Sequence, residues 1–178
     1  MIRRVVPVTE NDSSRSKLGT YAIADNYTAF WFRFVQPYAS ELSPDNNRWA
    51  LAEFDRHFRD AHVSFVFEEI CRSRTRSMSD EIGFTPERVG NYRRGSTDVD
   101  VMALNTAEKK VFAAECKYFE SEPVGLDVLR KLKETVGGIR ELEGYEITYG
   151  LFSATGFTDA VLKERTVVLV DNGEPVNH

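Results

Sequence analysis

Three residues, Asp100, Glu115 and Lys117, have the types and spacing expected of a catalytic metal site. Glu115 and Lys117 lie two residues apart in the apolar segment VFAAECKY (residues 111–118). In a β-strand both side chains therefore point to one face, and Cys116 between them points to the other. Placing two charges on such a strand is costly unless they pair or bind an ion. The sequence predicts either a cation site or a buried ion pair here.

A second carboxylate comes from the preceding strand. Residues 97–104 and 110–118 are expected to be neighbouring strands, and a simple hairpin would place Asp100 opposite Ala114 and beside Glu115. Two carboxylates, with water completing the shell, are the hard oxygen ligands that Mg²⁺ or Mn²⁺ prefers. Lys117 would then assist the attacking water and stabilise charge developing on a phosphate.

The acid-x-Lys spacing alone carries little weight. Glu108 and Lys110 have the same separation in a polar turn, where a solvated charge cluster is expected. The apolar setting of Glu115 favours a metal site over a plain ion pair. An upstream helix offers a further acid, because Glu68 and Glu69 fall on opposite flanks of its apolar stripe and either could reach a cleft.

Hydrophobic periodicity predicts the elements that position these residues. The first 42 residues are typical of a strand hairpin followed by an aromatic helix that Asp25 caps and whose rings pack in a core. A longer helix begins at the Ser43-Pro44-Asp45 signal and has a break near His62. Then come three strands, a helix, a strand, a short helix and a strand, expected at residues 84–88 or beyond, 97–104, 110–118, 123–136, 145–152, 157–163 and 166–170.

This order determines the expected fold class. A strand-helix-strand-helix-strand tail requires some parallel pairing, with helices on the faces of the sheet. We predict an α/β fold of mixed α+β character, a mixed sheet flanked by helices with an N-terminal hairpin and helical appendage. Residues 1–42 would form the appendage, 43–172 the main domain and 173–178 a tail.

Composition excludes several classes of protein. Hydrophobic residues at 42% and charged residues at 29% indicate a chain that folds. No apolar run reaches the roughly 20 residues that a membrane span needs, and no apolar leader follows Met1. Only two cysteines, Cys71 and Cys116, are present, so we expect reduced thiols and a cytoplasmic location.

The net charge of −5 argues against nonspecific wrapping of nucleic acid. It leaves room for a local basic rim, and four arginines are candidates for phosphate contacts beside the acids: Arg72, Arg74, Arg93 and Arg94. A solvated charged face is the alternative explanation of the same residues.

The series Glu68 or Glu69, then Asp100, then Glu115-Cys116-Lys117, followed by a helix and a strand, resembles the PD-(D/E)XK nuclease superfamily. This resemblance covers about residues 63–170. It implies a restriction-endonuclease-like sheet and a DNA endonuclease that uses Mg²⁺ or Mn²⁺. It also implies that Asp100, Glu115 and Glu68 bind metal and that Lys117 joins them in catalysis, with Asp98 as an alternative to Asp100.

A closer resemblance covers almost the whole chain. Four segments look like the family of unknown function that forms the C-terminal region of archaeal and bacterial AAA-type ATPases: YAIADNYTAFWFRFVQP (21–37), VFEEICR (66–72), DVDVMAL (98–104) and ECKY (115–118). It implies an ATPase module in cis or in trans as a partner, and the N-terminal hairpin as the remnant wing of a winged helix. A second copy of the chain is a further expected partner.

The chain itself has no G-x-x-x-x-G-K-[ST] segment, so it is not expected to bind ATP as a P-loop ATPase. Two functions follow from the resemblances. The first is a metal-dependent nuclease acting on DNA. The alternative is a catalytically inactive regulatory or interaction module that keeps the nuclease fold while an ATPase does the work.

Overall fold

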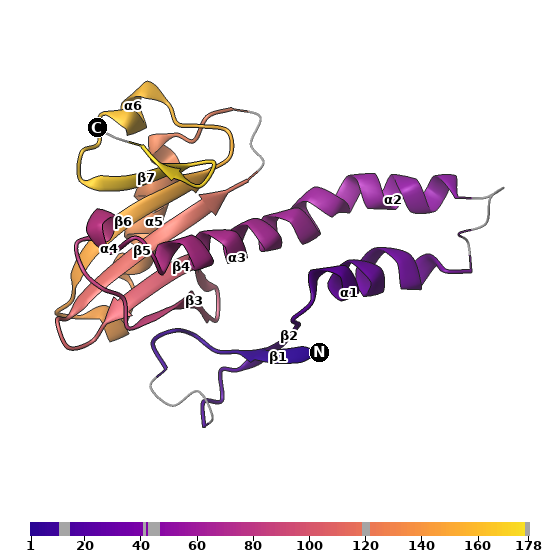
Figure 1. The fold of residues 1–178 in the computed structure, drawn as a ribbon, viewed down its shortest axis with the longest axis horizontal. Coiled ribbons are helices and arrows are strands. Elements are labelled where there is room, and N and C mark those ends of the chain that lie inside the picture. The colour runs from indigo at the N-terminus through magenta and orange to yellow at the C-terminus, as the bar shows by residue number, and fades with distance from the viewer. Residues whose placement is uncertain (11–14, 41, 43–46, 119–121, 177–178) are drawn as a thin grey trace.

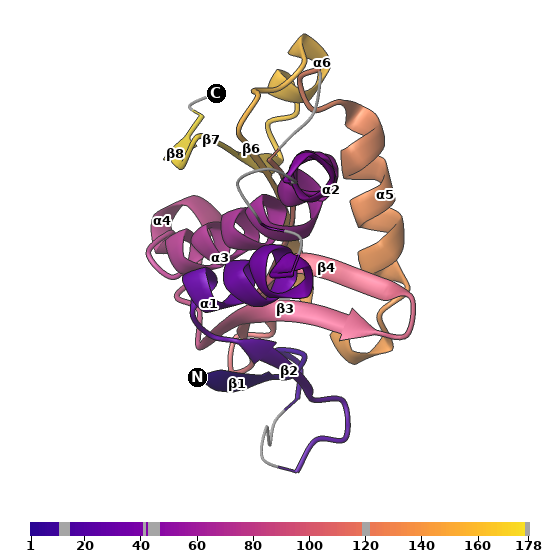
Figure 2. The ribbon, with the colours of Figure 1, turned by 90° about the vertical axis from the view of Figure 1, so that its right-hand side faces the viewer.

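The structure, a computed structural model, describes the chain except for residues 11–14, 41, 43–46, 119–121 and 177–178. Its central element is β5 (Lys110–Lys117), in which residues 111–114 are fully buried. A strand that is apolar on both faces must be covered on both faces. The helix α3 (Ser64–Thr75) covers one face of the sheet and α5 (Leu126–Gly137) covers the other (Figure 2).

β5 belongs to a six-stranded mixed sheet (Figure 1). β3, β4 and β5 form an antiparallel meander, β5, β6 and β7 run parallel, and β8 returns antiparallel to β7. The bounds are β3 (Arg88–Arg94), β4 (Thr97–Asn105), β6 (Glu146–Ser153), β7 (Val167–Asp171) and β8 (Glu174–Pro175). The parallel crossovers contain α5 and the short α6 (Asp159–Leu162). The predicted mixed sheet flanked by helices is confirmed.

Alternation along β5 divides the core into two layers. Val111 and Ala113 pack in the cluster on the α5 face, whereas Phe112 and Ala114 pack in the cluster on the α3 face. The α5 helix contributes buried residues at helical spacing: Leu129, Leu132 and Val136. After α5 a 3-10 turn (Arg140–Leu142) leads into β6.

The N-terminal appendage consists of a hairpin and helices (Figure 1). The strands β1 (Ile2–Val5) and β2 (Thr20–Ile23) pair antiparallel. Asp25 then caps α1 (Asn26–Phe30) as predicted, because its Oδ1 accepts a hydrogen bond from the Thr28 amide at 2.7 Å. A π-helical segment (Trp31–Val35) and a 3-10 turn (Gln36–Tyr38) complete this helical stretch.

The second long helical stretch is continuous through the predicted break near His62. It runs from α2 (Arg48–Phe58) through a π-helical segment (Arg59–Val63) into α3. Aromatic side chains hold it against the first stretch, with ring centroids 4.5 to 6.2 Å apart, among Phe30, Phe34, Phe54, Phe58 and His62. The helix signal predicted at Ser43-Pro44-Asp45 lies outside the described residues, and α2 itself begins at Arg48 with Asn47 as its N-cap.

Two local assignments differ from the sequence prediction. The strand expected from residue 84 begins only at Arg88, after a single-turn helix α4 (Ser79–Ile82) and a buried Phe84. Glu174 and Pro175, within the segment 173–178 expected as a tail, form β8, because positive φ angles at Asn172 (48°) and Gly173 (89°) turn the chain back along β7. Among the described residues, no helix combines the length and apolarity that crossing a bilayer requires.

Close packing at Gly150 yields a test of the sheet. A Cβ added at Gly150 of β6 would lie 2.4 Å from the fully buried ring of Phe112. We expect Gly150→Ala to lower the free energy of unfolding by about 1–3 kcal/mol, measured by urea denaturation. Gly137→Ala, where an added Cβ meets nothing within 4 Å, is the control and should not destabilise the protein. Equal losses in the two variants would contradict this packing.

Candidate functional site

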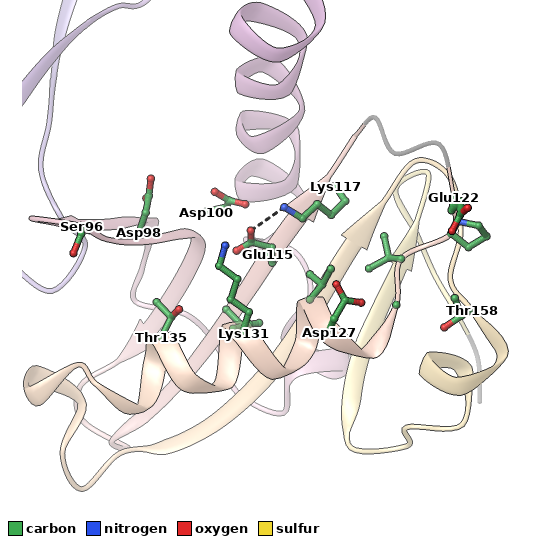
Figure 3. Close-up of a pocket in the computed structure, with 15 residues that line it drawn as sticks. Ser96, Asp98, Asp100, Glu115, Lys117, Glu122, Asp127, Lys131, Thr135 and Thr158 are labelled. Carbon is green, nitrogen blue, oxygen red and sulfur yellow. Dashed lines mark hydrogen bonds and ion pairs between the residues drawn. The ribbon is translucent and has the colours of Figure 1, made fainter.

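A cleft of about 770 Å³ beside α5 contains the predicted acids and lysine (Figure 3). Asp100 of β4 and the pair Glu115 and Lys117 of β5 all line it. Cys116 packs instead in the cluster on the α3 face, so the alternation expected along this strand holds. The structure therefore brings together three of the residues that the sequence pattern singles out.

The pairing of β4 with β5 differs by one residue from the expected register. The hairpin places Val101, and not Asp100, opposite Ala114. β4 has one extra residue relative to β3 at Asp100 and Val101, which is a β-bulge. There the Asp100 Oδ2 accepts a hydrogen bond from the backbone N–H of Cys116 at 2.9 Å. This bond holds the carboxylate next to Glu115.

Asp100 is the most strongly perturbed acid of the cleft. Burial, followed by the negative charges of Glu115 and Glu68, raises the pKa of Asp100 to about 7, although the Cys116 amide opposes this. Acids gathered in this way repel one another. A bound cation would reduce this repulsion, and an all-oxygen donor set favours a hard divalent ion.

Lys117 forms the ion pair that the sequence analysis raised as the alternative to a metal. Its Nζ lies 3.1 Å from Glu115 Oε1, and both side chains are about three-quarters buried. The ammonium thus compensates one carboxylate of the cleft. Its position beside Glu115 also places a proton donor at the point where a phosphate or water would meet the acids.

Of the two helix acids, Glu68 is the one near the site. Its charge acts on Asp100, and burial raises the pKa of Glu68 itself while the bond to Arg72 opposes that rise. Arg72 Nη1 lies 3.2 Å from Glu68 Oε2 and donates to the Asp100 carbonyl at 2.9 Å. Glu69 instead pairs with Arg3 of the hairpin. Glu68 is therefore the better third acid, although it does not line the cleft.

Asp98 also lines the cleft, but it already has a cationic partner. The Nε of Arg93 donates to Asp98 Oδ2 at 2.9 Å, and both side chains are exposed. Asp100 is thus the carboxylate of β4 with more to gain from a cation. Within the part of the chain that the structure describes, no three His, Cys, Asp or Glu side chains form a ready metal cage.

The four predicted arginines do not form one rim beside the acids. Arg72 is tied to Glu68, and Arg93 to Asp98. The other two bind elsewhere: Arg94 pairs with Glu141, and Arg74 donates to the Gly173 carbonyl at 3.2 Å. None of the four lines the cleft.

The cleft includes residues of α5 that the sequence analysis did not select. Asp127, Lys131 and Thr135 line it from the helix (Figure 3). Their spacing of four residues puts them on one face of the helix, next to its buried face. The sequence shows this spacing, but it indicates a role in the cleft only once α5 is known to lie beside Glu115.

Comparison with known proteins adds a family match. A family model described as archaeal and bacterial proteins of unknown function (DUF234) matches residues 31–129, which include Glu68, Asp100, Glu115 and Lys117. An uncharacterized protein of Methanocaldococcus jannaschii is 28% identical over 154 residues, covering 76% of this chain and 34% of that protein. The chain thus spans about a third of this relative's length. No solved structure gives a match.

The raised pKa of Asp100 makes the stability of the fold depend on pH. Its folded-state pKa of about 7 exceeds the roughly 3.9 of an unfolded chain, so its contribution is fully present below pH 4 and is lost as the pH rises through 7. Asp100→Asn, which cannot ionise, should therefore gain stability relative to wild type between pH 5 and pH 8. Urea denaturation in EDTA measures this, and a difference that does not change with pH would contradict it.

Proposed function

The chain belongs to the DUF234 family of archaeal and bacterial proteins of unknown function, and from its cleft we propose that it is a metal-dependent nuclease. The reaction would be hydrolysis of phosphodiester bonds, with DNA as the expected substrate. The observation that supports this most directly is that Asp100 and Glu115 line one cleft, with the Lys117 ammonium beside Glu115 (Figure 3).

The donor set fits a divalent cation. Asp100 and Glu115 would hold Mg²⁺ or Mn²⁺, Glu68 would orient water or a second ion, and water would complete the shell. Mg²⁺ commonly keeps several waters and binds through one or two carboxylates, so two cleft acids are sufficient. When bound, the ion would lower the pKa of a water ligand and polarise the phosphate.

The protein's own residues would orient the substrate. Lys117 would donate a hydrogen bond to the attacking water or to a phosphate oxygen as negative charge develops there. Lys131 extends from α5 toward Glu115 (Figure 3), where its ammonium would contact the adjacent phosphate. Thr135, one turn further along the helix, adds a hydroxyl donor on the same side.

The order of these residues supports the same proposal. A helix acid, a strand acid and an acid-x-Lys on the next strand resemble the PD-(D/E)XK arrangement, and the mixed sheet with α3 and α5 on its faces is compatible with it. From the resemblance to the C-terminal region of AAA-type ATPases we also propose an ATPase module, in cis or in trans, as the working partner; the M. jannaschii relative, about three times as long as the matched region, has room for further domains. Self-association and a cytoplasmic setting belong to the same proposal.

One observation favours the alternative of an inactive interaction module. Glu115 is paired with Lys117 and Glu68 with Arg72, so two of the three acids are compensated within the chain itself. A fold that satisfies its acids in this way does not need a metal. Metal binding and cleavage therefore have to be measured separately.

Titration calorimetry with Mn²⁺ tests the metal site. We expect wild type to bind Mn²⁺ and both Asp100→Ala and Glu115→Ala to lose the heat signal, because each removes one of the two carboxylates that would hold the ion. Glu108→Ala is the matched control, since Glu108 pairs with Lys110 two residues later in a turn outside the cleft. Wild type without a heat signal at millimolar Mn²⁺ would contradict the metal site.

Plasmid nicking tests the chemistry. With Mn²⁺, wild type should relax supercoiled plasmid and EDTA should abolish the reaction. Lys117→Met should lower the rate by at least about 100-fold while Mn²⁺ still binds, because the lysine acts on water or phosphate and is not a ligand. Mn²⁺ binding by wild type without any cleavage would instead favour the inactive module or a nuclease that its ATPase partner activates.

A further inference from the structure

A second groove, which we call the arginine groove, lies between the N-terminal hairpin, α3 and β3. Five arginines line it: Arg3, Arg4, Arg72, Arg76 and Arg93. Glu68 is the acid in the same lining. In a chain of net charge −5, this concentrates positive charge at one place. Such a groove attracts a polyanion, because phosphates that bind arginines release their condensed counterions.

Two exposed aromatic side chains line the same groove. Tyr21 of β2 is 74% exposed and Phe65 of α3 is 48% exposed. Exposed rings beside arginines are the combination that binds single-stranded nucleic acid, in which bases stack on the rings and guanidinium groups contact the backbone. The paired bases of a duplex are stacked on each other and offer no free face to such rings.

The arginines of the groove have internal partners and retain capacity for phosphate. Arg3 pairs with Glu69, Arg93 pairs with Asp98, and Arg76 Nη1 donates to the Arg72 carbonyl at 3.3 Å. A guanidinium group carries five N–H donors, so one partner does not exhaust it. Arg3, Arg76 and Arg93 are exposed, which leaves their groups accessible to a ligand.

The arginine groove is adjacent to the cleft of the acids. Asp100 is the junction, because its carbonyl accepts a hydrogen bond from Arg72 of the groove while its carboxylate lines the cleft. The pair Arg93 and Asp98 spans the same boundary, with the arginine in the groove and the aspartate in the cleft. A strand lying in the groove would thus come close to the acids.

We propose that the arginine groove binds single-stranded nucleic acid, with phosphates on its arginines and bases stacked on Tyr21 and Phe65. The claim that the bound strand is also the substrate rests on the proposed nuclease function. Binding itself does not, since none of the groove contacts requires a metal. DNA and RNA share the phosphates and bases that such a groove recognises.

Fluorescence anisotropy in EDTA tests binding apart from cleavage. The probes are fluorescein-labelled 12-nucleotide oligo-dT and oligo-U, which show whether one sugar is preferred, and a labelled mixed-sequence duplex of equal length. Tyr21→Ala and Phe65→Ala, tested separately, should each weaken single-strand binding at least about fivefold. Tyr27→Ala is the matched control, because this tyrosine is 70% exposed and lies outside the groove.

The arginines are tested through salt dependence. Arg76→Gln should weaken binding and reduce the slope of log affinity against log salt by about 0.7, the value for one phosphate contact on a single strand. Arg130→Gln, an exposed arginine of α5 that does not line the groove, is the charge-matched control and should leave the slope unchanged. Circular dichroism and thermal unfolding verify that every variant is folded.

Several results would overturn the proposal: no single-strand binding, duplex binding as tight as single-strand binding, groove variants that behave as their controls, or inorganic polyphosphate competing as well as unlabelled oligonucleotide. Either oligo-dT or oligo-U binding with the expected losses supports it. The two proposals fail separately. Strand binding in EDTA without cleavage in Mn²⁺ would remove only a nuclease that is active by itself, and cleavage with unchanged groove variants would remove only the groove.

Discussion

The arrangement of the cleft depends on how one buried carboxylate, that of Asp100, is held beside other acids. Its carboxylate accepts a hydrogen bond from the backbone N–H of Cys116, and its backbone carbonyl accepts one from Arg72 of α3. An acid placed this way is destabilising by itself, since burial and like charges both oppose its ionised form. The two hydrogen bonds keep it in place, and they connect β4 to β5 and to α3.

The packed sheet holds these mutually repelling acids in position. Residues 111–114 of β5 are apolar and packed in the two core layers, which fixes the position of the strand. The polar residues follow directly after Ala114. The polar end then projects Glu115 and Lys117 into the cleft under α5. The neighbouring ion pairs contribute position more than stability, since the cost of removing two charges from water offsets much of their attraction.

Much of this arrangement could be predicted from local patterns. Strand alternation is sufficient to predict that Glu115 and Cys116 point to opposite faces, and the helical period is sufficient to predict the buried face of α5. The register of β4 differs by one residue from the predicted one, because it depends on where the hairpin closes and on a bulge that no short pattern reveals. Long-range partners, such as Glu141 for Arg94, were also beyond the sequence, since 47 residues separate them.

The π-helical segment Arg59–Val63 joins α2 to α3 in one continuous helix (Figure 1). It therefore determines how the contact face of α2 is rotated about the helix axis relative to that of α3. In α2, Phe54 and Phe58 pack against the first helical stretch, whereas in α3 Cys71 packs against the sheet. A residue added to or removed from an α-helix rotates everything beyond it by about 100°. Inserting or deleting a residue in this segment would therefore rotate Glu68 away from the site if the aromatic contacts of α2 are kept, even though no side chain of either face is changed.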